Sequence, residues 1–358
     1  MKIIIATGGS GGHVFPALSV AIELRSRGHE IVFLGTPGLA AEKIEKNNFR
    51  FVGLCAKGIA YRSLASFFVS INCMLTATGQ ALRFLKEFKP DVVAGFGGYG
   101  AFPTVAAAFL LRCPTLIHEQ NVVPGKANYL LSKFSKRVAV SFAESRRYFN
   151  QKKVVLTGCP CRKKPNELPR EEILRKFNLS PDKPIILIVG GSQGSRRINK
   201  DFFEAAILLK ESLDFQIIHI SGKKDYEDLK ASYERSGMHF CLFDFLDEID
   251  LAYMASDLVI CRAGAMTINE VALFRLPAVL IPYPFAGGHQ KENAKVLCRA
   301  QIAQMIEEHE LTPERLRAVI LELLTRRIKK EEIALRAEKF FYADSAIRLA
   351  NEIELIKE

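Results

Sequence analysis

Short runs of β-branched and other apolar residues alternate along the chain with longer segments in which apolar residues recur at helical spacing. This alternation is typical of parallel sheets whose strands are covered by helices on both faces. The predicted strands of a first series span residues 2–6, 30–34, 91–95, 115–118 and 153–156, and those of a second series span 185–189, 216–220, 258–261 and 278–281. The pattern therefore predicts an α/β protein with two doubly wound parallel sheets.

Both series open on the same unit, a strand followed by a glycine turn and a helix. GGSGG at 8–12 follows the first strand, and GGSQG at 190–194 follows the strand at 185–189. Residues 163–184 between the series are rich in proline and charge, as boundary segments are. A chain of 358 residues also exceeds the usual size of a single hydrophobic core. We therefore predict domains at 1–162 and 163–341, with a ligand cleft between them, because ligands bind at the carboxyl ends of such strands.

The glycine turns suit phosphate, because glycines let the backbone approach an anion and the following helix N-terminus presents unbonded N–H groups. Pro16 predicts that the first helix begins near residues 13–15. A dinucleotide does not match, since Val14 stands where the fingerprint needs its third glycine and Ser192 replaces the second glycine of the other turn. Neither turn ends in the Gly-Lys-Ser/Thr of a P-loop. A nucleoside diphosphate remains the candidate ligand.

Further polar residues follow the strand at 258–261. Arg262 begins a turn that leads to a predicted helix N-terminus suited to a pyrophosphate, and the carboxylate of Glu270, one turn on, could accept two ribose hydroxyls. An ordinary solvated glutamate is the alternative for Glu270. Gln290 and Asn293 stand near another helix start, where they either bind sugar hydroxyls or cap the helix.

His13 is the titratable group best placed for catalysis, because it directly follows the first glycine turn. A helix N-terminus lowers the basicity of imidazole, which would keep His13 neutral and able to act as a general base. Its alternative role is capping or phosphate contact. A third glycine turn, GFGGYGAFP, spans 95–103. HEQN at 118–121 ends another strand, either as substrate contacts or as a hydrogen-bonded loop network.

Composition says more about the compartment than about the function. The net charge of +11 favours a polyanionic partner, and nucleic acid, an anionic membrane or a phosphorylated substrate would each satisfy it. The eight cysteines lack zinc spacing and are predicted to be free, buried thiols. The apolar run at 3–6 is too short for a signal peptide. Both features indicate the cytoplasm.

Residues 64–85 form the most apolar helical segment, but polar residues interrupt it too often for a membrane span. Arg62 precedes the segment, and Lys86 and Lys89 follow it. This mixture suits a helix that lies in a membrane interface with its cations near lipid phosphates. An ordinary core helix is the alternative.

The motifs together resemble those of the MurG family of bacterial glycosyltransferases. The resemblance covers nearly the whole chain and rests on GGSGGHVFPA at 8–17, GFGGYGAFP at 95–103, HEQNVVPGKAN at 118–128, GGSQGSRRIN at 190–199, CRAGAMTINE at 261–270 and GGHQKENA at 287–294. It implies the GT-B fold, two Rossmann-like domains with the active site between them, and a last helix at about 342–358 that packs back on the first domain. The implied reaction is inverting transfer of N-acetylglucosamine from UDP-N-acetylglucosamine to the muramoyl sugar of lipid I, which forms lipid II for peptidoglycan.

The resemblance also assigns residues to the two substrates. Those expected to bind the donor are Ser10, Gly11, Gly12, Asn121, Arg162, Ser192, Gln193, Gly194, Leu246, Arg262, Ala265, Met266, Thr267, Ile268, Asn269, Glu270 and Gln290. Those expected on the acceptor side are Gly97, Gly98, Tyr99, His118, Glu119 and Asn128. His13 is the candidate base, Glu270 should hold the ribose hydroxyls and Ser192 the phosphates. The chain has no Asp-x-Asp triplet, so neither a bound cofactor nor an essential metal is expected.

The expected partners are UDP-N-acetylglucosamine, lipid I and an anionic membrane surface bound through residues 62–89. Other cell-wall synthesis and division proteins are further candidates, and nucleic acid is not expected. The expected location is the cytoplasmic face of the inner membrane, as a peripheral protein. A UDP-N-acetylglucosamine 2-epimerase and a lipid galactosyl- or glucosyltransferase are alternatives with the same fold. A non-catalytic membrane- or nucleic-acid-binding protein would explain the charge but not the paired glycine turns.

Overall fold

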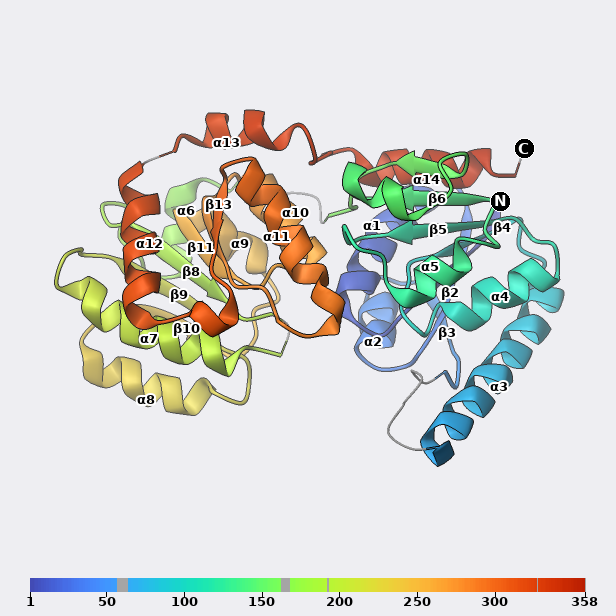
Figure 1. The fold of residues 1–358 in the computed structure, drawn as a ribbon, viewed down its shortest axis with the longest axis horizontal. Coiled ribbons are helices and arrows are strands. Elements are labelled where there is room, and N and C mark those ends of the chain that lie inside the picture. The colour runs from blue at the N-terminus through green and yellow to red at the C-terminus, as the bar shows by residue number, and fades with distance from the viewer. Residues whose placement is uncertain (57–63, 162–167, 192, 327, 358) are drawn as a thin grey trace. The chain divides into compact units, whose positions relative to one another are not determined.

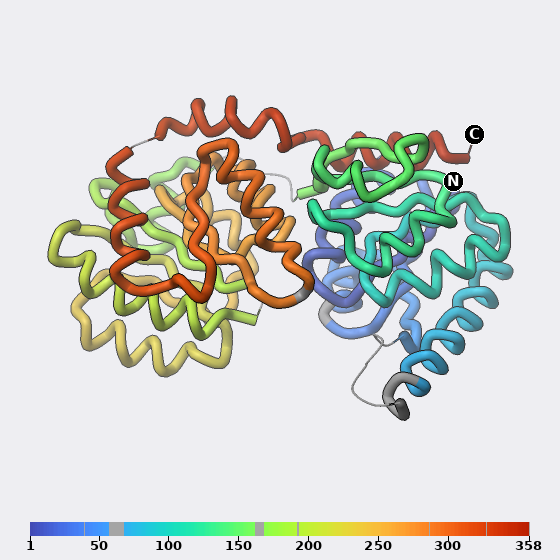
Figure 2. Tube along the Cα trace, viewed as in Figure 1, coloured from blue at the N-terminus to red at the C-terminus, as the bar shows by residue number. Residues whose placement is uncertain are grey.

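The computed structural model describes residues 1–56, 64–161, 168–191, 193–326 and 328–357 (Figure 1). The chain forms two compact units: unit 1 comprises Met1–Arg162 and Tyr342–Glu358, and unit 2 comprises Lys163–Phe341. Each unit is a parallel sheet covered by helices, as the backbone trace in Figure 2 also shows. Residues 342–358 thus belong to the same unit as residues 1–162, although unit 2 separates them in the sequence.

The described part of unit 1 has seven parallel strands in the order β3-β2-β1-β4-β5-β6-β7. They are β1 (Lys2–Thr7), β2 (Glu30–Gly35), β3 (Arg50–Gly53), β4 (Val92–Gly95), β5 (Thr115–Glu119), β6 (Arg137–Val140) and β7 (Val154–Leu156). The helices are α1 (Gly11–Ser26), α2 (Leu39–Lys46), α3 (Leu64–Phe88), α4 (Phe102–Leu110), α5 (Lys126–Leu131), the 3₁₀ helix η1 (Ala143–Tyr148) and α14 (Ser345–Leu355). Successive strand side chains point to opposite faces, so Ile3 and Ile5 pack with α1 and α14, whereas Ile4 and Ala6 pack with α3 and α4.

The described part of unit 2 has six parallel strands in the order β10-β9-β8-β11-β12-β13. They are β8 (Ile185–Val189), β9 (Gln216–Ile220), β10 (His239–Phe243), β11 (Leu258–Cys261), β12 (Ala278–Leu280) and β13 (Ala303–Met305). The helices are α6 (Arg170–Lys176), α7 (Arg196–Lys210), α8 (Tyr226–Ser236), α9 (Ile249–Ala255), α10 (Ala265–Phe274), α11 (His289–Arg299), α12 (Pro313–Arg326) and α13 (Lys330–Ala337), with 3₁₀ helices η2 (Ala286–Gly288) and η3 (Glu308–Glu310).

Each sheet has one point where the strand order reverses direction. In unit 1 this point lies between β1 and β4, because β2 and β3 lie on one side of β1 and the later strands on the other. In unit 2 it lies between β8 and β11, because β9 and β10 lie on one side of β8 and the later strands on the other. Ligands of doubly wound sheets bind at the carboxyl ends of the two strands that flank this switch point. The glycine turns after β1, β4 and β8 and the turn after β11 all lie at these ends. The topology therefore gives each unit one favoured ligand position.

All nine strands predicted from the sequence are present, with ends displaced by at most one residue. The sequence pattern does not predict β3, β6, β10 and β13. Three of these are edge strands of their sheets. Edge strands are covered on fewer sides, so β3 and β13 carry polar residues such as Arg50 and Gln304 and lack a long apolar run.

The start of α1 corrects the expectation drawn from Pro16. The helix begins at Gly11, with Ser10 as N-cap in an extended conformation (φ −92°, ψ 150°), so Pro16 lies in the second turn and not in the first. Proline there lacks the N–H that would bond the carbonyl of Gly12. His13 is consequently the third residue of the helix.

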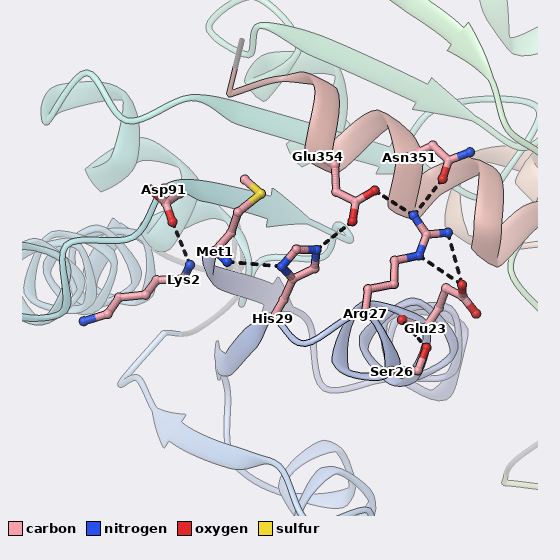
Figure 3. Close-up of polar contacts among 9 residues, drawn as sticks. All are labelled: Met1, Lys2, Glu23, Ser26, Arg27, His29, Asp91, Asn351 and Glu354. Atoms are coloured by element: carbon pink, nitrogen blue, oxygen red, sulfur yellow. Dashed lines mark hydrogen bonds and ion pairs between the residues drawn. The ribbon is translucent and has the colours of Figure 1, made fainter.

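The last helix is held on unit 1 by buried apolar residues and by the polar contacts in Figure 3. Arg27 donates hydrogen bonds of 2.7 Å to Asn351 Oδ1 and to Glu354 Oε2, and His29 Nε2 lies 2.6 Å from Glu354 Oε1. Leu349, Ala350 and Ile353 are fully buried in the core that includes α1. Partly exposed ion pairs contribute little to stability, so the three apolar residues provide most of the attachment.

Two sequence expectations concern the whole chain. Within the described residues, no helix combines the length and apolar character needed to cross a bilayer. The eight cysteines are free, but only Cys159 and Cys261 are buried. The expectation of buried thiols is wrong for Cys55, which is exposed, and the remaining five cysteines are partly exposed.

Candidate active site

The first and third glycine turns lie together at the switch point of unit 1. His13 is packed against Gly97 and Gly98: a Cβ atom added to Gly97 would lie 3.2 Å from His13 Cδ2 and 2.9 Å from Asn128 Nδ2. Any side chain at position 97 would therefore displace the imidazole or the amide. Ser10, Gly12 and Tyr99 are exposed on the same turns, and Gly11 and Gly98 are partly exposed. Unit 1 thus presents a hydroxyl, an imidazole and a helix N-terminus at one position.

The His13 imidazole is paired with Ser10. Ser10 Oγ lies 2.7 Å from His13 Nδ1, and the Ser10 side chain makes no capping hydrogen bond to the backbone of α1. Burial lowers the pKa of His13 to about 4, so the ring is neutral at pH 7. When Nδ1 carries the proton and donates it to Ser10 Oγ, Nε2 keeps its lone pair and can accept a proton.

HEQN and Asn128 do not form the exposed acceptor surface that the resemblance implies. Three side chains of HEQN and that of Asn128 are at most 2% exposed, namely His118, Glu119, Gln120 and Asn128. Glu119 accepts hydrogen bonds from Asn128 Nδ2 at 2.9 Å and from Asn121 Nδ2 at 3.1 Å. Burial raises the pKa of Glu119, and these donors oppose that shift. Direct acceptor binding by His118, Glu119 and Asn128 is therefore corrected: they form the alternative loop network, which orients the partly exposed Asn121.

In unit 2 the turn after β11 places the N-terminus of α10 at the switch point. Gly264 is the N-cap, and Ile268 N–H is the first amide to bond back along the helix, to Gly264 O at 3.0 Å. The amides of the first turn therefore point out of the helix end, where an anion is stabilised. Thr267 and Glu270 are partly exposed one turn apart. This arrangement suits a diphosphate at the helix end with a ribose beside Glu270.

Two residues of α10 are wrongly assigned to donor binding by the resemblance. Ile268 and Asn269 are fully buried. Asn269 Nδ2 donates to Ala265 O at 2.8 Å, and the N–H of Ile268 is used within the helix. The 3.6-residue period directs both side chains into the core while Thr267 and Glu270 face outward.

No sequence pattern points to the residue that contacts the Glu270 carboxylate. Tyr253, on α9, is 1% exposed, and its hydroxyl donates to Glu270 Oε2 at 3.3 Å. A tyrosine in the apolar segment LAYMA is indistinguishable by pattern from a core residue. The contact restricts the rotamer of the Glu270 carboxylate, which prepares the carboxylate for a ligand.

Arg262 is held by several contacts within unit 2. Its Nη2 donates to Ser195 Oγ at 2.7 Å, its Nη1 donates to Ile281 O at 3.2 Å, and it forms an ion pair with Glu308. The guanidinium also lies over the ring of Tyr283, 5.4 Å from the centroid. Through these contacts Arg262 joins the loops around the site, and its contact with the donor stays a prediction.

Gln290 and Asn293 do not cap the helix start, and their contact with sugar hydroxyls stays a prediction. Gln290 Oε1 accepts from Ala263 N at 3.1 Å and from Tyr283 N at 3.0 Å. Asn293 is fully buried and donates from Nδ2 to Ala263 O at 3.2 Å. The N-cap of α11 is Gly288. Both side chains thus fix the turn after β11, and Gln290 remains partly exposed.

Some of the remaining residues expected to bind the sugar donor are exposed or partly exposed, and others lie outside the described residues. Arg162 and Ser192 lie outside the described residues, as does Arg62 of the expected membrane segment. Gln193 is exposed and Gly194 partly exposed in the turn after β8. Leu246 is partly exposed in the loop after β10. In the described chain, no group of three or more His, Cys, Asp or Glu side chains is arranged to hold a metal ion.

Buried His219 gives a pH dependence of stability that can be measured. Burial lowers its pKa to about 3, below the value of about 6.5 in an unfolded chain. The unfolded state therefore binds more protons, and stability falls as pH drops from about 6.5 toward 3. We expect the urea midpoint of His219→Phe to be lower at pH 8 and to fall less between pH 7 and pH 5 than that of the wild type. His309→Phe, at an exposed position, should keep the wild-type slope; equal slopes in all three proteins would contradict the expectation.

Two Rossmann-like units, each with a helix N-terminus at its switch point, form the GT-B fold of nucleotide-sugar glycosyltransferases. The "Glycosyltransferase family 28 N-terminal domain" matches residues 3–140, and the "Glycosyltransferase family 28 C-terminal domain" matches residues 185–349. The chain belongs to the MurG family of these glycosyltransferases.

The similarity extends over nearly the full length of the relatives. The UDP-N-acetylglucosamine--N-acetylmuramyl-(pentapeptide) pyrophosphoryl-undecaprenol N-acetylglucosamine transferase of Geotalea uraniireducens is 37% identical over 358 residues, which cover 99% of this chain and 98% of the relative. The protein of the same name from Halothermothrix orenii is 38% identical over 345 residues, covering 92% of each. The crystal structure of Acinetobacter baumannii MurG matches with a TM-score of 0.77 and 30% identity over 99% of both chains. A putative UDP-N-acetylglucosamine 2-epimerase from Listeria monocytogenes, with a TM-score of 0.73 and 15% identity over 99% of this chain and 95% of that one, shares the fold alone.

Proposed function

We propose that this enzyme transfers N-acetylglucosamine from UDP-N-acetylglucosamine to the muramoyl sugar of lipid I and so forms lipid II for peptidoglycan. The observation that carries the proposal is identity of 35–38% to transferases of that name, over nearly the full chain. The 2-epimerase is disfavoured because its likeness is limited to the fold at 15% identity.

In the proposed reaction, unit 2 binds the donor. The amides of the first turn of α10 and of the glycine turn 190–194 hold the diphosphate, and Glu270 accepts hydrogen bonds from the ribose hydroxyls. As UDP leaves, negative charge grows on the diphosphate oxygen that is released. Helix N-termini fixed in advance stabilise that charge without reorganisation.

Unit 1 supplies the base in this proposal. The acceptor hydroxyl attacks the anomeric carbon, a new carbon–oxygen bond forms, and the bond from that carbon to the diphosphate breaks with inversion. The hydroxyl proton passes to Nε2 of His13 while Nδ1 donates to Ser10 Oγ. The depressed pKa of His13 keeps the ring neutral and ready to accept this proton across the neutral range.

The test is transfer of labelled N-acetylglucosamine from the UDP donor to a lipid I analogue, with UDP release measured in parallel. Labelled lipid II and acceptor-dependent UDP release are expected. Conversion of the donor to its 2-epimer without acceptor would indicate the epimerase instead. Transfer of galactose or glucose to a diacylglycerol, with none to lipid I, would indicate a lipid glycosyltransferase.

We also propose that unit 1 binds the membrane through an apolar patch broader than α3. On α3, Phe68, Val69 and Leu75 are exposed while Ala77 and Ala81 are buried. Exposed apolar side chains continue on α4 and around α5, which packs against α4: they are Phe109, Leu110, Tyr129, Leu130 and Phe134. The rings of Phe109 and Phe134 are 5.1 Å apart. We call this second group the α4–α5 patch.

Cations next to the α4–α5 patch support contact with anionic lipid. Lys133 Nζ lies 5.5 Å from the ring centre of Tyr129, and Arg112 and Lys126 are exposed nearby in sequence. Apolar side chains that enter the interface together with cations near lipid phosphates give binding that salt weakens. α3 therefore contributes both a core face and an exposed face, and a peripheral position at the cytoplasmic membrane surface follows from the proposal.

Leu110→Ser is expected to reduce binding to vesicles that contain anionic lipid by several-fold, because it removes one large apolar side chain from the interface. Sedimentation with vesicles at two salt concentrations measures the effect. Leu335→Ser on α13 is the matched control, since Leu335 is 65% exposed and Leu110 is 63% exposed. Equal binding by the two variants would exclude the α4–α5 patch as a membrane contact.

A further inference from the structure

A chain of buried polar side chains connects α7, β9 and α8 in unit 2. Asn199 on α7 is 2% exposed, and His219 on β9 and Tyr233 on α8 are fully buried. Burying three polar side chains is costly unless each is hydrogen-bonded. None of them has a role in the donor contacts considered above.

The hydrogen bonds of this cluster have a single consistent direction. Asn199 Oδ1 can only accept, so His219 Nε2, 3.0 Å away, carries the proton and donates. His219 Nδ1 then accepts from the Tyr233 hydroxyl at 2.9 Å. The Asn199 amide nitrogen donates twice, to Ser221 O at 2.9 Å and to Asp225 Oδ2 at 2.8 Å. His219 and Tyr233 therefore fix the orientation of the amide, and the amide fixes the loop between β9 and α8.

That loop is the support on which the glycine turn after β8 rests. A Cβ atom added to Gly194 would lie 2.1 Å from Ser221 O, and one added to Gly222 would lie 2.7 Å from Gln193 O. Both glycines have positive φ, 75° and 81°, so neither position accepts another residue without strain. The backbones of the two loops are in direct contact, and a shift of Ser221 must move Gly194.

We propose that Asn199 is a positioning residue for the donor diphosphate. Its amide holds Ser221 and Gly222, and these hold the turn 190–194, whose amides bind the phosphates under the proposed function on which this inference rests. Asn199 is itself too deeply buried to touch the donor. A displacement of a catalytic group by about 1 Å can lower the rate by up to about 100-fold. A change at Asn199 is therefore expected to affect the donor by displacing the turn.

The test compares Asn199→Leu with Gln216→Leu. Gln216 is a second buried amide of unit 2, at the amino end of β9, and it makes two 2.8 Å hydrogen bonds with the backbone of Ser180. Both variants should lose stability. Only Asn199→Leu should raise the Kd for UDP and the KM for the donor, by about tenfold or more, with the KM for the lipid acceptor unchanged. Gln216→Leu should bind UDP within about twofold of the wild type.

A double variant removes the hydrogen bond from Asn199 to Ser221 O and keeps the packing. Asn199→Asp with Asp225→Asn retains volume, net charge and one hydrogen bond between the two positions, but Ser221 O loses its donor. It should bind UDP as weakly as Asn199→Leu. Wild-type UDP affinity in either Asn199 variant, or an equal loss in Gln216→Leu, would overturn the inference.

Amide hydrogen exchange without ligand separates this inference from the proposed function. The amides of Gly191, Gln193 and Gly194 should exchange faster in both Asn199 variants than in the wild type and in Gln216→Leu. Faster exchange together with a wild type that binds no UDP would reject the proposed function and keep the positioning role. Unchanged exchange in the Asn199 variants would reject the positioning role, whether or not their affinity for UDP changes.

Discussion

His13→Ala is expected to lower kcat for sugar transfer by roughly 10²- to 10⁴-fold, the usual contribution of a general base, and to leave the Kd for UDP nearly unchanged. The proton moves only in the transition state, so the loss belongs to kcat and not to donor binding. His13 also lies in unit 1, whereas the proposed UDP contacts lie in unit 2. Single-turnover transfer to a lipid I analogue and calorimetric titration with UDP measure the two quantities separately.

Ser10 supplies the graded control for this experiment. Ser10→Ala removes the partner of His13 Nδ1 and should reduce kcat less than loss of the imidazole, because the ring remains. Ser10→Thr keeps the hydroxyl and should transfer near the wild-type rate. His309→Ala, at an exposed position in unit 2, should change nothing. If His13→Ala weakens UDP binding as much as it slows transfer, His13 is a phosphate contact and not the base.

The pH profile gives an independent readout of the same residue. With a pKa of about 4, His13 stays neutral down to pH 5, so it should cause no fall in kcat/KM between pH 8 and pH 6. An unperturbed histidine would cause a fall near pH 6.5. A limb at pH 6.5 that disappears in His13→Ala would contradict the burial of the ring.

The sequence pattern predicts the sheets well because a strand buried on both faces must be apolar at every position. Residues 185–189 and 258–261 meet this condition, and their predicted ends agree with β8 and β11. The pattern fails where one side of a strand is uncovered, as at the edge strand β13, since Gln304 interrupts its apolar run. Strand prediction from a single sequence thus depends on the number of covering layers.

Prediction of the site fails for a different reason. A motif shows which residues follow a strand, but not which side of a helix they occupy. In CRAGAMTINE the helical period exposes Thr267 and Glu270 and buries Ile268 and Asn269. Arg262 is polar and adjacent to the site, yet its guanidinium is bound to Ser195 and Glu308. Tyr253 and Asn199 act through other residues, and partners distant in sequence cannot be identified from local spacing.

Glu270→Ala is expected to raise the Kd for UDP by about 100-fold. A hydrogen bond to a charged group contributes about 1.5–3 kcal/mol, and two ribose hydroxyls bound by one carboxylate would therefore account for at least two factors of ten at 1.4 kcal/mol each. Glu270→Gln keeps the shape but loses the charge, so its Kd should lie between those of the wild type and Glu270→Ala. Glu234→Ala, at an exposed position on α8, should bind UDP as the wild type does.

A donor without one ribose hydroxyl shows whether Glu270 acts on the ribose. If the carboxylate binds the 2′-hydroxyl, 2′-deoxy-UDP should bind the wild type more weakly than UDP does, and Glu270→Ala should bind the two equally, because a contact that is already absent cannot be lost again. The comparison cancels any general loosening of α10, since a structural defect would weaken both ligands and keep their ratio. A ratio in Glu270→Ala as large as in the wild type would place the ribose contact elsewhere in unit 2. In that case Tyr253→Phe, which removes the hydrogen bond to Glu270 Oε2, should also leave the ratio of the Kd for 2′-deoxy-UDP to the Kd for UDP unchanged.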